Sequence, residues 1–197
     1  MGRKINLSRD DWTDAALDWI AEHGVASLAI EPLARSLGVT KGGFYWCFGS
    51  RDELLQAALE RWELLGTQDI IRTVEQAPEA RTQVSELLAL VAGRIAPHSP
   101  EATRIVRLHF ALACAANDPL VAPVFQRVTA ARLRFLVRVL KLAGLPPKLA
   151  KQRATLAQAS YIGLVQLLAT QGREALGGFK PAELFAVFQK MLLAPAD

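Results

Sequence analysis

The amino-acid sequence predicts an all-α fold, in which a three-helix N-terminal domain is joined by a long helix to a C-terminal helical bundle, about nine helices in all. Apolar residues recur every three or four positions through most of the chain. No stretch alternates apolar and polar residues for long enough to predict a strand. Turn signals rich in Gly and Pro separate the periodic segments. With 197 residues, of which 51% are hydrophobic, the chain can bury one large core or two small ones.

The first predicted helix begins after Ser8, which we expect to cap its amino end, and runs to about His23, where Gly24 ends it. Five apolar residues at helical spacing form its buried stripe: Trp12, Ala15, Ala16, Trp19 and Ile20. Three acids spaced by four residues lie on another face: Asp14, Asp18 and Glu22. We expect this acidic face to be an ordinary solvated one.

Residues 30–48 contain two short amphipathic segments joined by a turn that includes a glycine. The apolar stripe of the first segment consists of Ile30, Leu33, Ala34 and Leu37. Gly38 then stands where a left-handed C-cap residue is needed. Thr40 can cap a second helix, in which Phe44 and Phe48 lie on one face and can pack against the first helix. This pattern predicts a helix-turn-helix, whose second helix presents Lys41, Gly42, Gly43, Tyr45 and Trp46 outward.

The adjacent glycines Gly42 and Gly43 stand in the first turns of this second helix, where each costs about 1 kcal/mol relative to alanine. One explanation is the close approach of a DNA phosphate to the free amide groups at the helix N-terminus, where the helix dipole favours an anion. The alternative is a loose loop end. The glycine pair therefore favours a nucleic-acid contact and leaves a plain turn open.

The rest of the chain predicts a series of longer helices. Ser50 and Glu53 indicate a capping box that opens a long helix, which runs to about Gln76 and is closed by Pro78. Further helices are predicted over residues 79–96, 101–116, 120–143, 147–172 and 181–193, because breaks rich in Pro, Gly or Asn separate these segments. Residues 1–50 would then form the helix-turn-helix domain and residues 51–197 a second, helical domain.

The net charge of +4 and the pI near 9.3 do not by themselves indicate DNA binding, because the basic surplus lies outside the first domain. Residues 1–60 hold six Lys and Arg against nine Asp and Glu, whereas residues 61–197 hold seventeen against ten. Arg3 and Lys4 are either a basic arm or a frayed terminus. Four basic residues share one face of the helix over residues 120–143: Arg127, Arg134, Arg138 and Lys141. That face is either solvated or attracts an acidic effector or DNA.

Several classes of protein are not indicated by the sequence. No apolar run has the length needed to cross a bilayer, and the N-terminal residues lack the apolar centre of a secretory signal, so we expect a cytoplasmic protein with no membrane contact. Cys47 and Cys114 lie far apart without metal-ligand spacing, so we expect neither a disulfide nor a metal site. Since no nucleotide-binding loop or nucleophile motif stands out, we expect no catalytic residues, no cofactor and no enzyme activity.

In order and spacing, the motifs of the first 60 residues resemble those of the TetR family of transcriptional regulators. They are the opening helix that ends at Gly24, then Leu33-Ala34, Gly38-Val39-Thr40, Lys41-Gly42-Gly43-Phe44-Tyr45, Phe48, and the segment from Ser50 to Leu55. The resemblance implies DNA contacts from the recognition helix through Thr40, Lys41, Gly42, Gly43, Tyr45 and Trp46, and a phosphate contact from Arg51 at the start of the next helix. The chain departs from the family at Leu28 and Ala29, where a Thr or Ser usually caps the second helix. Ser27 is the nearest hydroxyl group.

The same resemblance implies a dimeric one-component regulator, expected to be a repressor, that binds a near-palindromic operator in double-stranded DNA and is released by a small hydrophobic or amphipathic effector. The homodimer would form through the helices over residues 147–172 and 181–193, and the C-terminal domain would also bind the effector. Candidate pocket residues are large or polar side chains on otherwise apolar helices: Trp62, Arg107, His109, Phe110, Cys114, Phe125, Tyr161 and Gln166. The alternative function is a helical protein-interaction module without DNA binding.

Overall fold

Helices and connecting turns make up the structure, a computed structural model that describes residues 7–96 and 99–195; these residues contain no strand. The helix-turn-helix region contains α1 (Arg9–His23), α2 (Ile30–Ser36) and α3 (Lys41–Tyr45). The helices that follow are α4 (Arg51–Glu63), α5 (Asp69–Val74), α6 (Ala80–Ile95), α7 (Pro100–Cys114), α8 (Val121–Leu142), α9 (Pro147–Gln171) and α10 (Pro181–Leu193). The all-α prediction is confirmed. The predicted basic arm of Arg3 and Lys4 lies outside the described residues.

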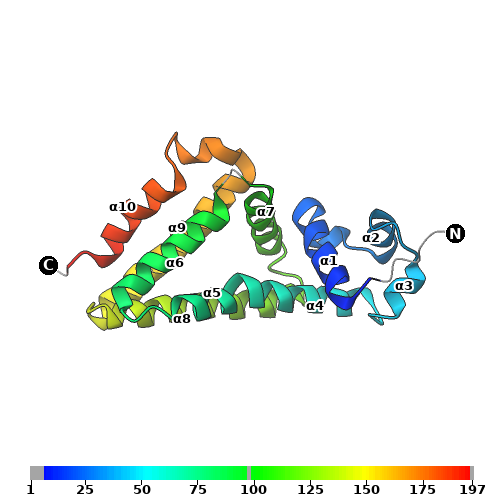
Figure 1. Cartoon of the computed structure of the whole chain (residues 1–197), viewed down its shortest axis with the longest axis horizontal. Helices are drawn as coiled ribbons and strands as arrows, with labels where there is room; N and C mark the ends of the chain where they lie inside the picture. Colours follow the sequence, from blue (N-terminus) through cyan, green and yellow to red (C-terminus); the bar gives the residue numbers. More distant parts are fainter. Residues whose placement is uncertain (1–6, 97–98, 196–197) are drawn as a thin grey trace.

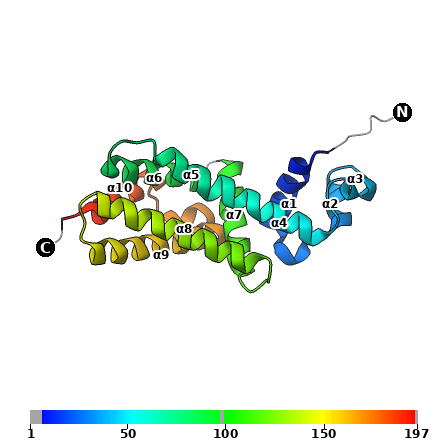
Figure 2. The ribbon, with the colours of Figure 1, turned by 90° about the horizontal axis from the view of Figure 1, so that it is seen from below.

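One long helical rod connects the two ends of the molecule. It consists of α4, a π-helical turn over Leu64–Gln68 and α5, which follow one another without a break. If the rod is counted as one helix, the described part of the chain contains nine helices, which is the number expected from the sequence. Figure 1 shows α1, α2 and α3 gathered at one end of the molecule and α10 near the other, with the rod and α8 along one edge. The view from below in Figure 2 shows the same separation.

Local capping explains most of the helix boundaries. Ser8 Oγ accepts a hydrogen bond from the Asp11 amide (3.1 Å), and the Asp11 carboxylate accepts one from the Ser8 amide (2.8 Å), so α1 begins with a full capping box. Gly24 and Gly38 have φ values of 79° and 67°, a left-handed conformation that suits glycine. Both glycines end their helices as predicted.

Two caps differ from the expectation. Thr40 occupies the N-cap position of α3, but its side chain makes no capping hydrogen bond, so that part of the prediction is wrong. Ser50 caps α4 by accepting from the Glu53 amide (3.1 Å), whereas the Glu53 carboxylate accepts from the amide of Gly49 (2.8 Å) rather than from Ser50. The predicted box is therefore only half formed, because the Glu53 side chain reaches one residue further back.

Aromatic packing fixes the helix-turn-helix against the rod. Phe44 is fully buried, stacks on Phe48 at a centroid separation of 5.6 Å and meets the edge of Trp12 at 5.4 Å. The same apolar cluster continues into Leu55 and Leu59 of α4 and on into α7 and α8. The predicted packing of Phe44 and Phe48 is confirmed. The core thus crosses the domain boundary that the sequence predicts near residue 50, a boundary that stays a prediction.

The acidic face of α1 is not an ordinary solvated one, and that expectation is wrong. The Asp14 carboxylate accepts two hydrogen bonds from Arg61 of α4, at 2.5 and 2.7 Å. One turn along, Asp18 accepts from Arg104 of α7 at 2.7 Å. These ion pairs fasten α1 to the second domain.

The basic face of α8 is likewise engaged within the chain. Arg127 forms a bidentate ion pair with the buried Glu63, and Arg138 pairs with Glu75. Arg134 and Lys141 are exposed. All four cations remain exposed, as expected for a solvated face, and two of them are already paired with acids of the chain.

None of the described helices is both long and apolar enough to span a lipid bilayer.

We predict that the Asp14–Arg61 pair stabilises the fold by about 1 kcal/mol, because its geometry is bidentate and Arg61 is largely shielded from water. The measurement is a double-mutant cycle of Asp14→Asn and Arg61→Gln, followed by urea denaturation at low and high salt. A coupling energy near zero would show that the two side chains act independently and that apolar packing alone holds α1.

Candidate nucleic-acid interface and ligand cavity

The exposed face of α3 carries two large aromatic side chains and a cation. Tyr45 is 59% exposed and Trp46 is 90% exposed, whereas the neighbouring Phe44 faces the core and is fully buried. Thr40 and Lys41 are exposed beside them. Because exposed aromatic and cationic groups gain little from the fold itself, their grouping on one short helix marks an interaction surface. These residues lie together at the end of the molecule where Figure 1 places α3.

Gly42 and Gly43 are not required by the fold. Neither has a positive φ. A Cβ added at Gly42 would meet only Thr40 Oγ1, at 3.7 Å, and one added at Gly43 would meet nothing within 4 Å. The pair therefore leaves the backbone of α3 open on its outer side without any packing reason inside the protein.

Lys41 is held in place by an acid of the preceding helix. Its Nζ lies 2.7 Å from the Glu31 carboxylate, and Glu31 also faces Arg35 at 4.0 Å. The hydrogen bond and charge of Lys41 lower the pKa of Glu31, and the same contact raises the pKa of Lys41. Both side chains remain at least half exposed, so the pair is accessible to a partner.

Arg51 and Ser27 serve the link between α1 and α2. Arg51 donates from Nε to the Leu28 carbonyl (3.1 Å) and from Nη2 to the Val25 carbonyl (3.0 Å), and it also pairs with Asp52. The guanidinium is thus engaged within the chain, and the phosphate contact implied by the resemblance stays a prediction. Ser27 donates to the Gly24 carbonyl and caps no helix, and α2 begins at Ile30 with Ala29 in the N-cap position and no side-chain cap.

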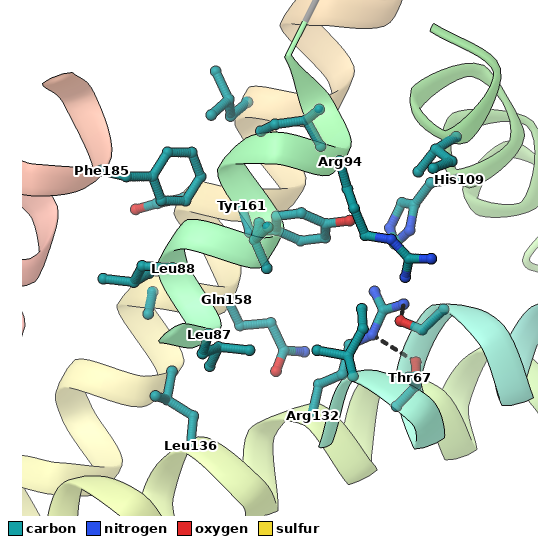
Figure 3. Close-up of a pocket in the computed structure, with 18 of the residues that line it drawn as sticks. Thr67, Leu87, Leu88, Arg94, His109, Arg132, Leu136, Gln158, Tyr161 and Phe185 are labelled. Atoms are coloured by element: carbon teal, nitrogen blue, oxygen red, sulfur yellow. Dashed lines mark hydrogen bonds between the residues drawn. The ribbon is translucent and has the colours of Figure 1, made fainter. Parts of the chain in front are cut away.

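A cavity of about 530 Å³ lies inside the C-terminal bundle, a size typical of small-molecule sites. The rod and helices α6 to α10 surround it. Figure 3 shows that its lining is divided: Phe185, Leu88, Leu87 and Leu136 gather on one side, and Arg94, His109, Arg132 and Thr67 gather on the other, with Tyr161 and Gln158 between. The cavity therefore has an apolar end and a polar end.

Two arginines at the polar end hold the π-helical turn of the rod. Arg132 donates from Nε to Thr67 Oγ1 (2.9 Å) and from Nη2 to the Gly66 carbonyl (3.0 Å). Arg94 donates to the Leu65 carbonyl (2.8 Å). A π turn replaces the i→i+4 hydrogen bonds of an α-helix with wider i→i+5 bonds, and these guanidinium groups add side-chain donors to its carbonyls.

His109 is a buried, neutral member of the same end. It is 5% exposed, it meets Tyr161 edge-on at 5.3 Å, and its Nε2 has no hydrogen-bond partner in the described part of the chain. Burial, together with the charge of Arg132, lowers the pKa of His109 to about 3. The imidazole is therefore uncharged at neutral pH and offers hydrogen bonding rather than charge.

The structure brings together only part of the predicted pocket. Trp62, His109 and Tyr161 line the cavity. Arg107, Cys114 and Gln166 are exposed and lie outside it, because they stand on the outer faces of α7 and α9. Phe110 packs in an apolar cluster with Ile95 and Val106, and Phe125 stacks on Trp62 at 6.0 Å, so both support the wall without lining it. The structure therefore brings three of the eight candidate residues to the cavity and places the other five outside its lining.

Sequence reasoning missed Arg94, Arg132 and Gln158. Arg132 had a detectable signal, since it falls four residues after Val128 and three before Phe135, on the stripe of α8 that is otherwise buried and apolar. A cation on a buried stripe is uncommon and marks a functional position more often than a cation on a polar face does.

Residues 13–58 match the family model described as bacterial regulatory proteins, tetR family. Two relatives from Pseudomonas putida, the HTH-type transcriptional regulator SrpR and the uncharacterized HTH-type transcriptional regulator TtgW, are each 32% identical over 88 residues, or 45% of this chain. The match spans 38% of SrpR and 61% of TtgW, so the chain covers less than two thirds of either relative.

Solved structures share the whole fold. A transcriptional regulator from Rhodococcus sp. Rha1 superposes with a TM-score of 0.73 at 23% identity, with 94% of both chains covered. A regulator from Saccharomonospora viridis, solved in complex with choline, gives 0.74 at 16% identity over 94% of this chain and 95% of its own. The fatty acid degradation regulator FadR from Bacillus halodurans gives 0.70 at 16% identity over 95% and 99%. At these identities the likeness shows the fold alone.

The two relatives and the Rhodococcus and Saccharomonospora proteins are named as transcriptional regulators, and the Bacillus halodurans protein is named as a regulator of fatty acid degradation. The family model covers the helix-turn-helix and the start of the rod, which are the segments that carry the motifs described from sequence. The helix-turn-helix region of this chain, over residues 13–58, is therefore that of the TetR family of bacterial regulatory proteins.

Proposed function

We propose that this chain is a DNA-binding transcriptional regulator, acting as a repressor, whose recognition helix is α3. The observation that carries the proposal is the exposed face of α3, where Lys41, Tyr45 and Trp46 stand beside two glycines that the fold does not need. In a helix-turn-helix the second helix enters the major groove, with its first residues nearest to the bases. The cation would contact phosphate and the aromatic groups would contact the groove.

The regulator would act as a homodimer. Helices α9 and α10 expose apolar side chains that support this assembly, among them Leu156, Leu167, Val187 and Met191. A twofold dimer would place two α3 helices about 34 Å apart, one turn of the duplex, and would therefore read a near-palindromic operator.

A small hydrophobic or amphipathic effector would fill the cavity and release the operator. The polar end of the cavity touches the rod at Trp62, Gly66 and Thr67, and the rod carries the helix-turn-helix at its other end. An effector that binds one arrangement of the rod more tightly than the other would shift the population away from the DNA-binding arrangement.

We predict that Tyr45→Ala and Lys41→Ala each weaken binding to the DNA that flanks the gene of this protein. Tyr45→Ala should cost about 1–3 kcal/mol if the ring contacts base edges, and Lys41→Ala should reduce the salt slope by about 1 because one phosphate contact is lost. Fluorescence anisotropy at several salt concentrations measures both. Arg134→Ala, an exposed change on α8, serves as the control. Weak binding by the unmodified chain with a flat salt slope, and no effect of either change, would favour a protein-interaction module instead.

We predict that the double change Gly42→Ala and Gly43→Ala stabilises the fold by up to about 2 kcal/mol and at the same time weakens operator binding, because the added methyl groups meet open space in the protein but would meet the DNA backbone. Thermal or urea denaturation and DNA titration measure the two effects. The matched control is Gly93→Ala in α6, whose added Cβ also meets nothing within 4 Å and which lies far from α3. If operator affinity remains unaltered in the double variant, α3 does not come close to DNA at these glycines.

A further inference from the structure

The cavity has a charge that its own lining does not neutralise. Three arginines line it, and only Arg104 is paired, with Asp18 of α1. Within the residues that the structure describes, neither Arg94 nor Arg132 forms an ion pair with a carboxylate. The one acid of the lining, Glu101, is exposed at the start of α7. Since His109 is neutral, the polar end holds a net positive charge.

Arg132 keeps hydrogen-bonding capacity toward the cavity. Its hydrogen bonds to the rod use Nε and Nη2, and the Tyr161 side chain is a further hydrogen-bond partner, which leaves some of the five guanidinium N–H groups available. The guanidinium lies between the rings of Trp62 and Tyr161, at 5.7 and 5.8 Å from their centroids, which fixes its plane. Burial lowers the pKa of Arg132, as expected for a cation that has lost water without gaining an anion.

Two further polar groups of the lining, one at this end and one between the two ends, lack partners. His109 Nε2 and Gln158 Oε1 are buried, and neither has a hydrogen-bond partner in the described structure. Rotating the Gln158 amide by half a turn would place its nitrogen where the oxygen now stands. Gln158 can therefore offer either a donor or an acceptor to a ligand, depending on the groups that the ligand presents. Arg132, His109 and Gln158 thus all face the same cavity, as Figure 3 shows for the labelled side chains.

The opposite end of the cavity is hydrocarbon. Leu87 and Leu88 of α6, Leu136 of α8 and Phe185 of α10 face it, and Figure 3 shows them on the side away from the arginines. A ligand that satisfies both ends must carry a compact anionic group on an apolar body.

We propose that the ligand of this cavity is an amphipathic monocarboxylic acid, with its carboxylate bound by Arg132 and Arg94 and its hydrocarbon body lying against Leu87, Leu88, Leu136 and Phe185. The carboxylate matches the guanidinium fork and supplies the counter-charge that the lining lacks. An alkyl ammonium would meet two like charges, and a neutral alcohol would leave them uncompensated. This inference rests on the proposed function only for the effect of the ligand on DNA.

The same two arginines couple the ligand to the rod. Arg94 and Arg132 donate to the carbonyls of Leu65 and Gly66 in the π turn, so a carboxylate bound between them competes for those donors. Weakening these bonds changes the geometry of the turn, and with it the direction in which α4 carries the helix-turn-helix. The acid therefore lowers operator affinity.

The experiment is a calorimetric titration of the full chain with dodecanoate below its micelle concentration, alongside dodecanol and dodecyltrimethylammonium as neutral and cationic probes of equal chain length. Dodecanoate should bind at least about tenfold more tightly than either, since a charged hydrogen-bonded pair is worth that much. Arg132→Met should abolish this preference while keeping the fold, because it removes a charge that costs desolvation. Arg94→Met should reduce the preference, and Arg134→Gln on the same helix as Arg132, outside the cavity, should leave it unchanged.

Equal binding of the three probes, absence of dodecanoate binding, or full preference in Arg132→Met would overturn the proposed ligand class. A DNA titration by fluorescence anisotropy, with and without dodecanoate, separates this inference from the proposed function. If the chain binds dodecanoate through Arg132 but binds no DNA under any condition, the regulator proposal fails and the ligand class stands. If the chain binds DNA and the acid binds without changing DNA affinity, the proposed coupling through the π turn is overturned.

Discussion

The attachment of α1 to both α4 and α7 is the constraint on which the rest of the structure depends. One face of α1 supplies Trp12, Ala16 and Ile20 to the first apolar core, and its acidic face binds Arg61 and Arg104. A helix held by apolar packing on one side and by ion pairs on the other cannot rotate independently of its neighbours. The orientation of α3 is therefore set by the helices that also surround the ligand cavity. The proposed ligand site and the proposed recognition helix would therefore be connected through the same packed helices.

The π turn in the rod is the point at which this shared element can yield. The carbonyls of Leu65 and Gly66 in this turn accept hydrogen bonds from side chains of α6 and α8, so contacts from outside the rod contribute to its geometry. Polar contacts of this kind have discrete alternatives, because a guanidinium either donates to the turn or donates to something else. Such a two-state contact is the physical requirement for coupling between sites, and it does not require the apolar core to deform.

Sequence reasoning recovered what local chemistry decides. Ser8, Gly24 and Gly38 set helix ends through their own side chains or backbone angles, so the bounds of α1 and α2 followed from a few neighbouring residues. Local alternatives explain the errors at Thr40 and Glu53, where another nearby group made the bond. The contacts of Asp14 with Arg61 and of Asp18 with Arg104 join residues 47 and 86 positions apart, and helical periodicity carries no information about such pairs. The cavity lining was predicted only in part for the same reason. Which side chains of α7 and α9 point into the bundle depends on how the helices assemble, and periodicity within one helix does not determine this.

Arg132 shows why stability alone does not explain this sequence. Burying a cation without an acid beside it costs folding free energy, and an apolar residue of similar volume on the same stripe of α8 would avoid that cost. Arg127, on the outer side of the same helix, forms an ion pair with Glu63. Its charge is therefore compensated within the chain, unlike that of Arg132. The contrast between Arg127 and Arg132 favours a role for Arg132 in recognising something outside the chain. Its hydrogen bonds to the rod then give that recognition a route to α3.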